Sequence, residues 1–155
     1  MAKRKSTKFD NSHLEQKFLA GWKKYTTIPI TLQRVFHPRR QWKFDFSFDD
    51  VLLAIEIQGY GAGHASYTGM KSDYEKHNSA IELGWVLLYF MNHDLQPLAI
   101  ESTVNRVQAL YQHLSESPST EFRKQLNLKV RSGIVHNISP NAPASTFQEW
   151  INRNG

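Results

Sequence analysis

Residues 41 to 59 constrain the fold more than any other part of the chain. QWKFDFSFD alternates aromatic and polar residues, a pattern typical of a strand with one buried face. Asp49 and Asp50 then favour a turn, and VLLAIEIQG predicts a second strand that ends in glycines. We expect the two strands to be neighbours, with one set of aromatic residues on a shared face: Trp42, Phe44, Phe46 and Phe48.

The segments around this strand pair predict an α/β fold with a small mixed sheet flanked by helices. SHLEQKFLAGW is expected to be a helix capped by Ser12 and Glu15, and SDYEKHNSAIEL a second helix capped by Ser72 and Glu75. WVLLYF predicts a strand buried on both faces, and residues 98–114 an amphipathic helix. A further strand is considered for residues 29–36.

Three regions are expected along the chain. Residues 1–11 form a basic tail and residues 12–114 the core. Residues 115–155 are rich in Ser, Asn and Pro, and are expected to be an extension or arm that packs on the core or on a partner subunit. A short helix is considered around residues 145–152.

Composition narrows the class of protein. The chain has 155 residues, of which 40% are hydrophobic, and this suits one globular domain. Its formal net charge of +5 favours a polyanionic partner or simply a soluble basic surface. The absence of cysteine excludes disulfides and thiolate zinc sites. With no secretory signal and no apolar run of membrane length, we expect a soluble cytoplasmic protein without membrane contact.

Each strand of the predicted pair contains an acid on its polar face. Period-two alternation places Asp45 and Glu56 on the polar faces of their strands, where they converge if the strands pair in register. Two carboxylates, with the backbone carbonyl of Ile57 as a third ligand, suit Mg²⁺ or Mn²⁺. The spacing alone favours two solvated strand acids over a metal site.

This hairpin resembles the active-site hairpin of the PD-(D/E)xK nuclease superfamily. Asp45 matches the first acid and Glu56 the second, while Gln58 stands where lysine is usual. GWVLLYF is similar to the strand that follows in phage and very-short-patch-repair-like endonucleases. The resemblance covers roughly residues 12–114. It implies a restriction-endonuclease-like α-β-β-β-α-β core and Mg²⁺-dependent cleavage of DNA, with Mn²⁺ as a substitute.

The resemblance also implies further site residues. Glu15 matches a first-helix glutamate that completes the metal cluster, although it also fits a helix cap. Because Gln58 carries no charge, Lys76 from the next helix is the candidate replacement for the missing lysine. His64 is a candidate general base or phosphate contact. Lys76 and His64 are also compatible with an ordinary surface position.

Basic and aromatic residues near the hairpin are candidates for DNA binding. Arg39, Arg40, Lys43 and Lys71 would contact phosphates, and Tyr60 would stack on an unpaired base. The alternatives are surface charge for the arginines and packing on the sheet edge for the tyrosine.

The expected function is therefore that of a Mg²⁺-dependent DNA endonuclease that leaves 5′-phosphate and 3′-hydroxyl ends. The resemblance favours a homodimeric Holliday junction resolvase of phage or mobile-element origin, acting in recombination or repair in the host cytoplasm. A mismatch or repair nicking enzyme and a restriction-type enzyme are alternatives. Gln58 also leaves open a non-catalytic DNA-binding module of the same fold.

Overall fold

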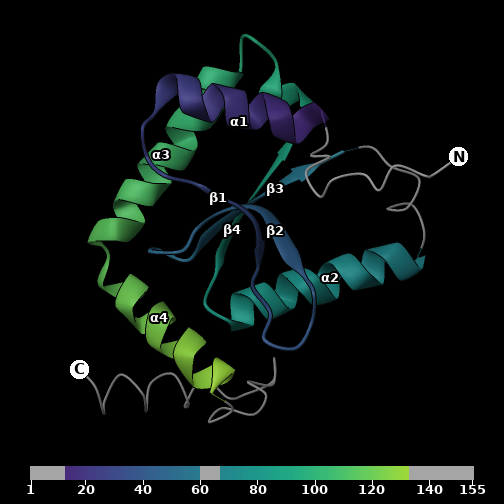
Figure 1. The fold of residues 1–155 in the computed structure, drawn as a ribbon, viewed down its shortest axis with the longest axis vertical. Coiled ribbons are helices and arrows are strands. Elements are labelled where there is room, and N and C mark those ends of the chain that lie inside the picture. The colour runs from purple at the N-terminus through teal and green to yellow at the C-terminus, as the bar shows by residue number, and fades with distance from the viewer. Residues whose placement is uncertain (1–12, 60–66, 133–155) are drawn as a thin grey trace, which may run out of the picture.

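A computed structural model describes residues 13–59 and 67–132 as an α/β fold with a small mixed sheet, which confirms the predicted class (Figure 1). Among these residues, no helix is both long enough and apolar enough to cross a membrane. The elements follow in this order: α1 (His13–Tyr25), β1 (Thr31–Val35), β2 (Lys43–Phe48), β3 (Leu53–Gln58), α2 (Tyr67–Glu82), β4 (Val86–Met91), the 3-10 helix η2 (Asn92–Leu95), α3 (Ile100–Glu116) and α4 (Pro118–Arg131).

The four strands are ordered β1-β2-β3-β4 across the sheet. β1, β2 and β3 pair in antiparallel fashion, whereas β4 runs parallel to β3 after the crossover through α2. A strand does lie within residues 29–36, since β1 is found there. β4 lies at the edge of the described sheet. The prediction that it is buried on both faces is only partly right, because the Phe90 residue is 1% exposed whereas the Tyr89 residue is 39% exposed.

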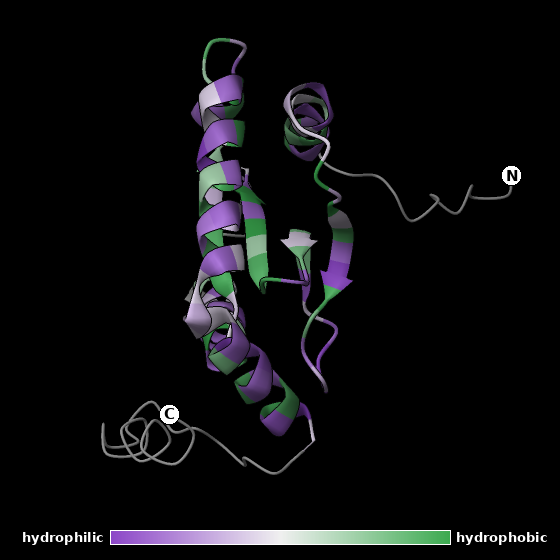
Figure 2. Cartoon of the chain, turned by 90° about the vertical axis from the view of Figure 1, so that its left-hand side faces the viewer, coloured by the Kyte–Doolittle hydropathy of each residue, from purple (hydrophilic) through white to green (hydrophobic). Residues whose placement is uncertain are grey.

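α1 and α3 cover one face of the sheet (Figure 1). Their predicted apolar stripes pack into one core, in which Phe18 of α1 contacts Phe46 of β2 with ring centroids 4.9 Å apart. At Gly21, α1 lies so close to α3 that a side chain there would collide with Ile100. Glycine, which has no side chain, permits this approach. In Figure 2, hydrophobic and hydrophilic segments alternate along α3, which fits a helix with one buried face.

α2 and α4 border a second, smaller core on the opposite face. No helix was predicted for Pro118–Arg131, yet α4 is held firmly there. Arg123 donates to the carbonyl oxygens of Val51 and Gly84 at 2.7 and 3.0 Å, and Asn127 donates to that of Leu83 at 2.8 Å. α4 is therefore fixed to the β2–β3 turn and to the end of α2.

The aromatic residues of β2 do not share one face, so that prediction is wrong. Phe46 packs in the core under α1, whereas Phe44 packs in the core under α2 and stacks on Phe36 with ring centroids 4.0 Å apart. The change of face falls at Asp45. On β1, the register places Gln33 opposite Asp45, and Gln33 has a left-handed φ of 52°. Both strands are therefore distorted at the first candidate acid.

α2 begins at Tyr67, five residues before the predicted start. Ser72 and Glu75 consequently lie inside the helix and do not cap it. Glu75 instead forms an ion pair with Lys71 one turn earlier, with 3.9 Å between Nζ and Oε1. The longer helix also places Asp73 and Lys76 one turn apart on neighbouring positions of its surface.

Candidate active site

A cavity of about 230 Å³ opens where β2 and β3 diverge beneath α2. β2, β3, α2 and β4 all contribute to its wall, so residues far apart in sequence meet there. Five predicted site residues are among the seven that line it. The seven are Asp45, Glu56, Ile57, Gln58, Asp73, Lys76 and Tyr89.

Side-chain hydrogen bonds hold the two strand acids at this divergence. The backbone ladder between β2 and β3 reaches Phe46 and Ile55, and the next step of its register places Asp45 opposite Glu56. There, the Ile57 N–H donates to Oδ2 of Asp45 at 2.7 Å, and the Asp45 N–H donates to Oε2 of Glu56 at 3.3 Å. Each carboxylate thus accepts a backbone hydrogen bond in place of a carbonyl oxygen. These bonds fix both acids where β2 and β3 diverge.

Lys76 brings a positive charge from α2 to this pair of acids. Its Nζ donates to Oε1 of Glu56 in a salt bridge in which the two side chains are only 25% and 10% exposed. The same ammonium lies 6.0 Å from the centroid of the Phe44 ring. Because α2 is anchored in the smaller core, the position of this charge is set by the fold.

The environment of Glu56 favours its protonated form. Burial raises the pKa of Glu56 to about 7, and the charge of Asp45 adds to the rise, while Lys76 opposes it. Burial also raises the pKa of Tyr89 to about 12, with smaller contributions from the charges of Glu56, Asp73 and Asp45. A buried carboxyl whose pKa lies near neutrality is typical of a functional site.

The donor set of the cavity suits a hard divalent cation. Three carboxyl groups and one ammonium line the cavity. When the carboxyl groups are ionised, the cavity attracts cations, and it repels a phosphodiester unless a cation lies between them. In residues 13–59 and 67–132, no three His, Asp or Glu side chains gather closely enough to form a metal site by themselves. Mg²⁺ is commonly held by one or two carboxylates, with waters and substrate phosphates completing its shell. Asp45, Glu56 and the carbonyl of Ile57 meet that requirement.

Glu15 does not line the cavity, but it is connected to its edge. Oε2 of Glu15 accepts a hydrogen bond of 3.2 Å from Nε2 of Gln33. Gln33 is the strained residue opposite Asp45. Glu15 therefore supports the distorted strand next to Asp45. This contact differs from the metal ligation that the resemblance implied for Glu15.

Arginines gather at the turn between β1 and β2, away from the cavity wall. The backbone N–H groups of Arg39 and Arg40 donate to Nδ1 of His37 at 3.1 and 2.9 Å, and the Arg40 guanidinium lies 4.6 Å from the Trp42 ring centroid. Burial lowers the pKa of His37, and so do the charges of Arg40, Arg131 and Arg39. Arg131 was not predicted; it comes from α4 and donates to the Phe36 carbonyl at 2.5 Å.

The remaining predicted DNA contacts have other positions. Lys43 is exposed at the start of β2, and Lys71 is exposed on α2 in its ion pair with Glu75. Tyr60 and His64 lie outside the described residues, as do the basic tail and the considered helix near residue 150.

Two residues of the cavity were not assigned to the site from sequence. Asp73 lies three residues before Lys76, and this spacing places both on one side of α2. Tyr89 enters because β4 pairs with β3 so that Tyr89 is opposite Glu56. No sequence signal sets that register.

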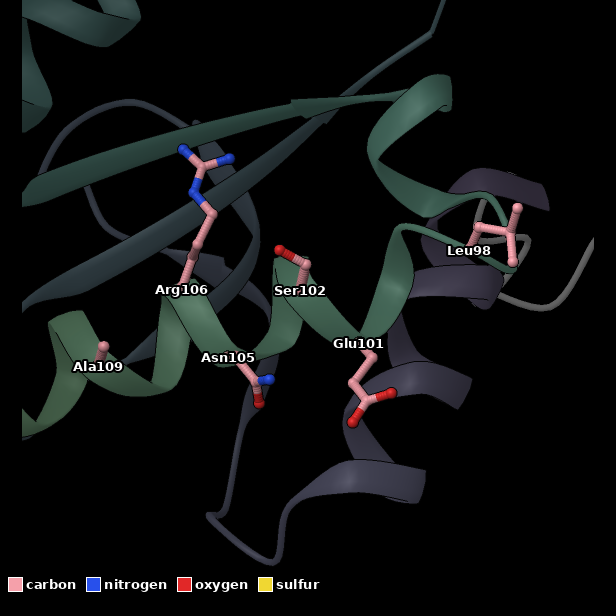
Figure 3. Close-up of a pocket in the computed structure, with 6 residues that line it drawn as sticks. All are labelled: Leu98, Glu101, Ser102, Asn105, Arg106 and Ala109. Carbon is pink, nitrogen blue, oxygen red and sulfur yellow. The ribbon is translucent and has the colours of Figure 1, made fainter.

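A larger hollow of about 510 Å³ lies on the outer face of α3 (Figure 3). Its polar groups do not converge: Arg106 points toward the strands, whereas Glu101 and Asn105 point away from them. The Arg106 guanidinium lies 5.5 Å from the Phe90 ring centroid. Unlike the cavity at Asp45 and Glu56, this hollow has no set of charged groups that point toward one another.

Comparisons of the chain with protein-family models, curated proteins and solved structures found no match. The candidate site is therefore defined by its own residues and their geometry.

Proposed function

We propose that this chain is a metal-dependent DNA endonuclease. The observation that carries the proposal is the convergence of Asp45, Glu56 and Lys76, from three elements, on one cavity. The order α1-β1-β2-β3-α2-β4, with one parallel pair at β3 and β4, supports a restriction-endonuclease-like core of the PD-(D/E)xK type. The order of the elements and the residues of the cavity both support this proposal.

Asp45, Glu56 and the Ile57 carbonyl would hold Mg²⁺, with Mn²⁺ as a substitute. When bound, the ion would acidify a water molecule and stabilise negative charge on the scissile phosphate. The two strand acids are suited to this role because backbone N–H groups already fix their orientation. The proposed role of Glu15 is to hold Gln33, and through it the strand opposite Asp45.

Lys76 would provide the charge that Gln58 lacks. A lysine of the superfamily pattern would stand on β3 at Gln58, whereas here the ammonium beside the second acid comes from α2. Its proposed role is to stabilise the charge that builds up on the phosphate. Gln58 is exposed at the end of β3 and lines the same cavity, where its amide can orient a water molecule.

The arginine cluster at the β1–β2 turn is the proposed contact with the DNA backbone. Arg39, Arg40 and Arg131 lie close enough together to influence one histidine, His37. Such a cluster would bind phosphates without reading sequence. We further propose a branched substrate such as a four-way junction, cut by a homodimer with two sites, on the strength of the family resemblance.

A panel of labelled substrates tests the proposal. Purified protein is incubated with a four-way junction, a linear duplex and a mismatched duplex, each with Mg²⁺, Mn²⁺ or EDTA. We expect cleavage with either metal and none in EDTA, with junction cuts placed symmetrically on opposing strands. Binding of all three DNAs without any cleavage would contradict the enzyme and favour a DNA-binding module of the same fold.

A further inference from the structure

A second groove, of about 530 Å³, adjoins the proposed active site. It shares Gln58, Asp73 and Tyr89 with the catalytic cavity, so the two form one continuous depression along α2 and β4. A strand whose phosphate lies at Asp45 and Glu56 would pass this groove next. The other residues that line it are Tyr74, His77, Met91, His93 and Asp94.

The charge of the groove disfavours a phosphate. The acids that line it are Asp73 and Asp94, and no Lys or Arg is among the lining residues. His93 also lines the groove, with its Nε2 3.3 Å from Oδ1 of Asp94. Asp94 is held in place, since its Oδ2 accepts a hydrogen bond of 2.8 Å from the Met91 N–H. A phosphodiester would be repelled here, whereas the amino group of a nucleobase could donate to a carboxylate.

Aromatic rings provide the surface that a base requires. The rings of His77 and Tyr89 stack with centroids 5.5 Å apart at 25°, and His77 Nδ1 lies 2.7 Å from the Tyr89 hydroxyl. This bond braces both rings across the gap between α2 and β4. Tyr74, one turn before His77, also lines the groove and is 62% exposed. Unpaired bases stack on such rings regardless of sequence.

From this arrangement we propose that the groove binds one unpaired nucleobase of the DNA strand whose neighbouring phosphate occupies the catalytic cavity. Tyr74 stacks on the base, while the braced pair of His77 and Tyr89 forms the wall. This subsite rests on the proposed endonuclease function and specifies its substrate: DNA with an unpaired nucleotide beside the scissile bond. A fully paired duplex cannot deliver a base there without opening.

Binding of 2-aminopurine oligonucleotides tests the subsite separately from catalysis. A single strand that carries the fluorescent base, and a duplex in which the base is paired, are titrated with protein in Ca²⁺ and again in EDTA. The expected result is a loss of fluorescence of about twofold or more for the single strand only, as stacking requires. Tyr74→Ala should weaken single-strand binding about tenfold, and Tyr74→Phe should retain it, because the ring and not the hydroxyl makes the contact.

Ile81→Ala is the matched control, since Ile81 is an exposed side chain on the same helix outside the groove. It should bind like the wild type. If Tyr74→Ala binds the single strand with wild-type affinity and quenches its fluorescence as much as the wild type does, the subsite is overturned, even if the protein cleaves DNA. A ring-dependent loss of fluorescence without cleavage in Mg²⁺ would instead support the subsite and contradict the endonuclease.

Discussion

The ammonium of Lys76 on α2 contacts the carboxylate of Glu56 on β3, although the two residues are twenty positions apart in the chain. The contact combines a buried acid with a cation that a different element supplies. In the acid-x-lysine pattern both groups would come from one strand. The proposed function depends on this substitution of a helix lysine for a strand lysine.

Removal of that ammonium should impair chemistry more than binding. Lys76→Met keeps most of the aliphatic chain but loses the ammonium, which lies 6.0 Å from the Phe44 ring centroid. Single-turnover cleavage should slow by about 100- to 1,000-fold, the usual effect of losing one group that stabilises transition-state charge. Lys124→Met, on α4 and outside the cavity, serves as control and should cleave within severalfold of wild type.

Transfer of the lysine to β3 should restore part of the activity. Gln58 lines the same cavity as Lys76, so Gln58→Lys combined with Lys76→Met returns one ammonium to the site in the position typical of the superfamily. We expect this double variant to cleave at least about tenfold faster than Lys76→Met alone. Equal rates for the two variants would argue against a shared role for positions 58 and 76.

Glu56 should make stability depend on pH in an unusual direction. Its folded-state pKa of about 7 lies above the ordinary 4.5, so between those values the folded protein binds a proton that the unfolded chain does not. The resulting stabilisation is complete below pH 4.5 and is lost as the pH rises to about 7. At about 1.4 kcal/mol per pH unit, the free energy of unfolding should fall by up to about 3 kcal/mol.

Urea unfolding in EDTA at pH 4.5 and pH 8 measures this contribution. Glu56→Gln cannot titrate, so its change in stability over this range should be smaller than that of wild type by about 2–3 kcal/mol. Glu101→Gln, an exposed acid on α3, should retain the wild-type change. The same pH dependence in wild type and Glu56→Gln would show that Glu56 titrates normally.

Gly84 should be essential for the docking of α4. Its φ of +86° is unfavourable for any side chain, and a Cβ there would lie 2.6 Å from the Arg123 carbonyl oxygen. Gly84→Ala should therefore reduce the free energy of unfolding by at least about 2 kcal/mol. Gly59→Ala offers a control, because among the described residues the nearest atom to its Cβ would be in Leu14, at an ordinary 3.9 Å. Equal stability of the two variants would exclude this role for Gly84.

Local periodicity predicted the elements whose buried faces are apolar. The stripes of α1 and α3, the two strands of the hairpin and the short strand after Gly84 all carry enough apolar residues to reveal their period. α4 was not predicted because its buried residues, Thr120 and Asn127, are polar and do not contribute to a hydrophobic pattern. Its Ser117 cap and Pro118 were the signals of its start.

The candidate site could be predicted from the sequence only in part. Alternation on two neighbouring strands indicated Asp45 and Glu56, and the family resemblance indicated Lys76 on the next helix. Tyr89 could not be predicted, because it depends on the register of a parallel pair joined through a long crossover. The aromatic residues of β2 were placed on one face because the distortion opposite Gln33 overrides period-two alternation.

Asp45 is proposed to serve metal-dependent cleavage, and a comparison of two aspartates tests this role most directly. Asp45→Asn and Asp49→Asn remove equal charge from neighbouring positions, but Asp49 contacts Arg34 and Ser47 outside the cavity. In single-turnover cleavage of a labelled four-way junction with Mg²⁺, Asp45→Asn should be slower than wild type by about 1,000-fold or more with junction binding intact, whereas Asp49→Asn should cleave within severalfold of wild type. Cleavage by Asp45→Asn at the wild-type rate would contradict the proposed active site.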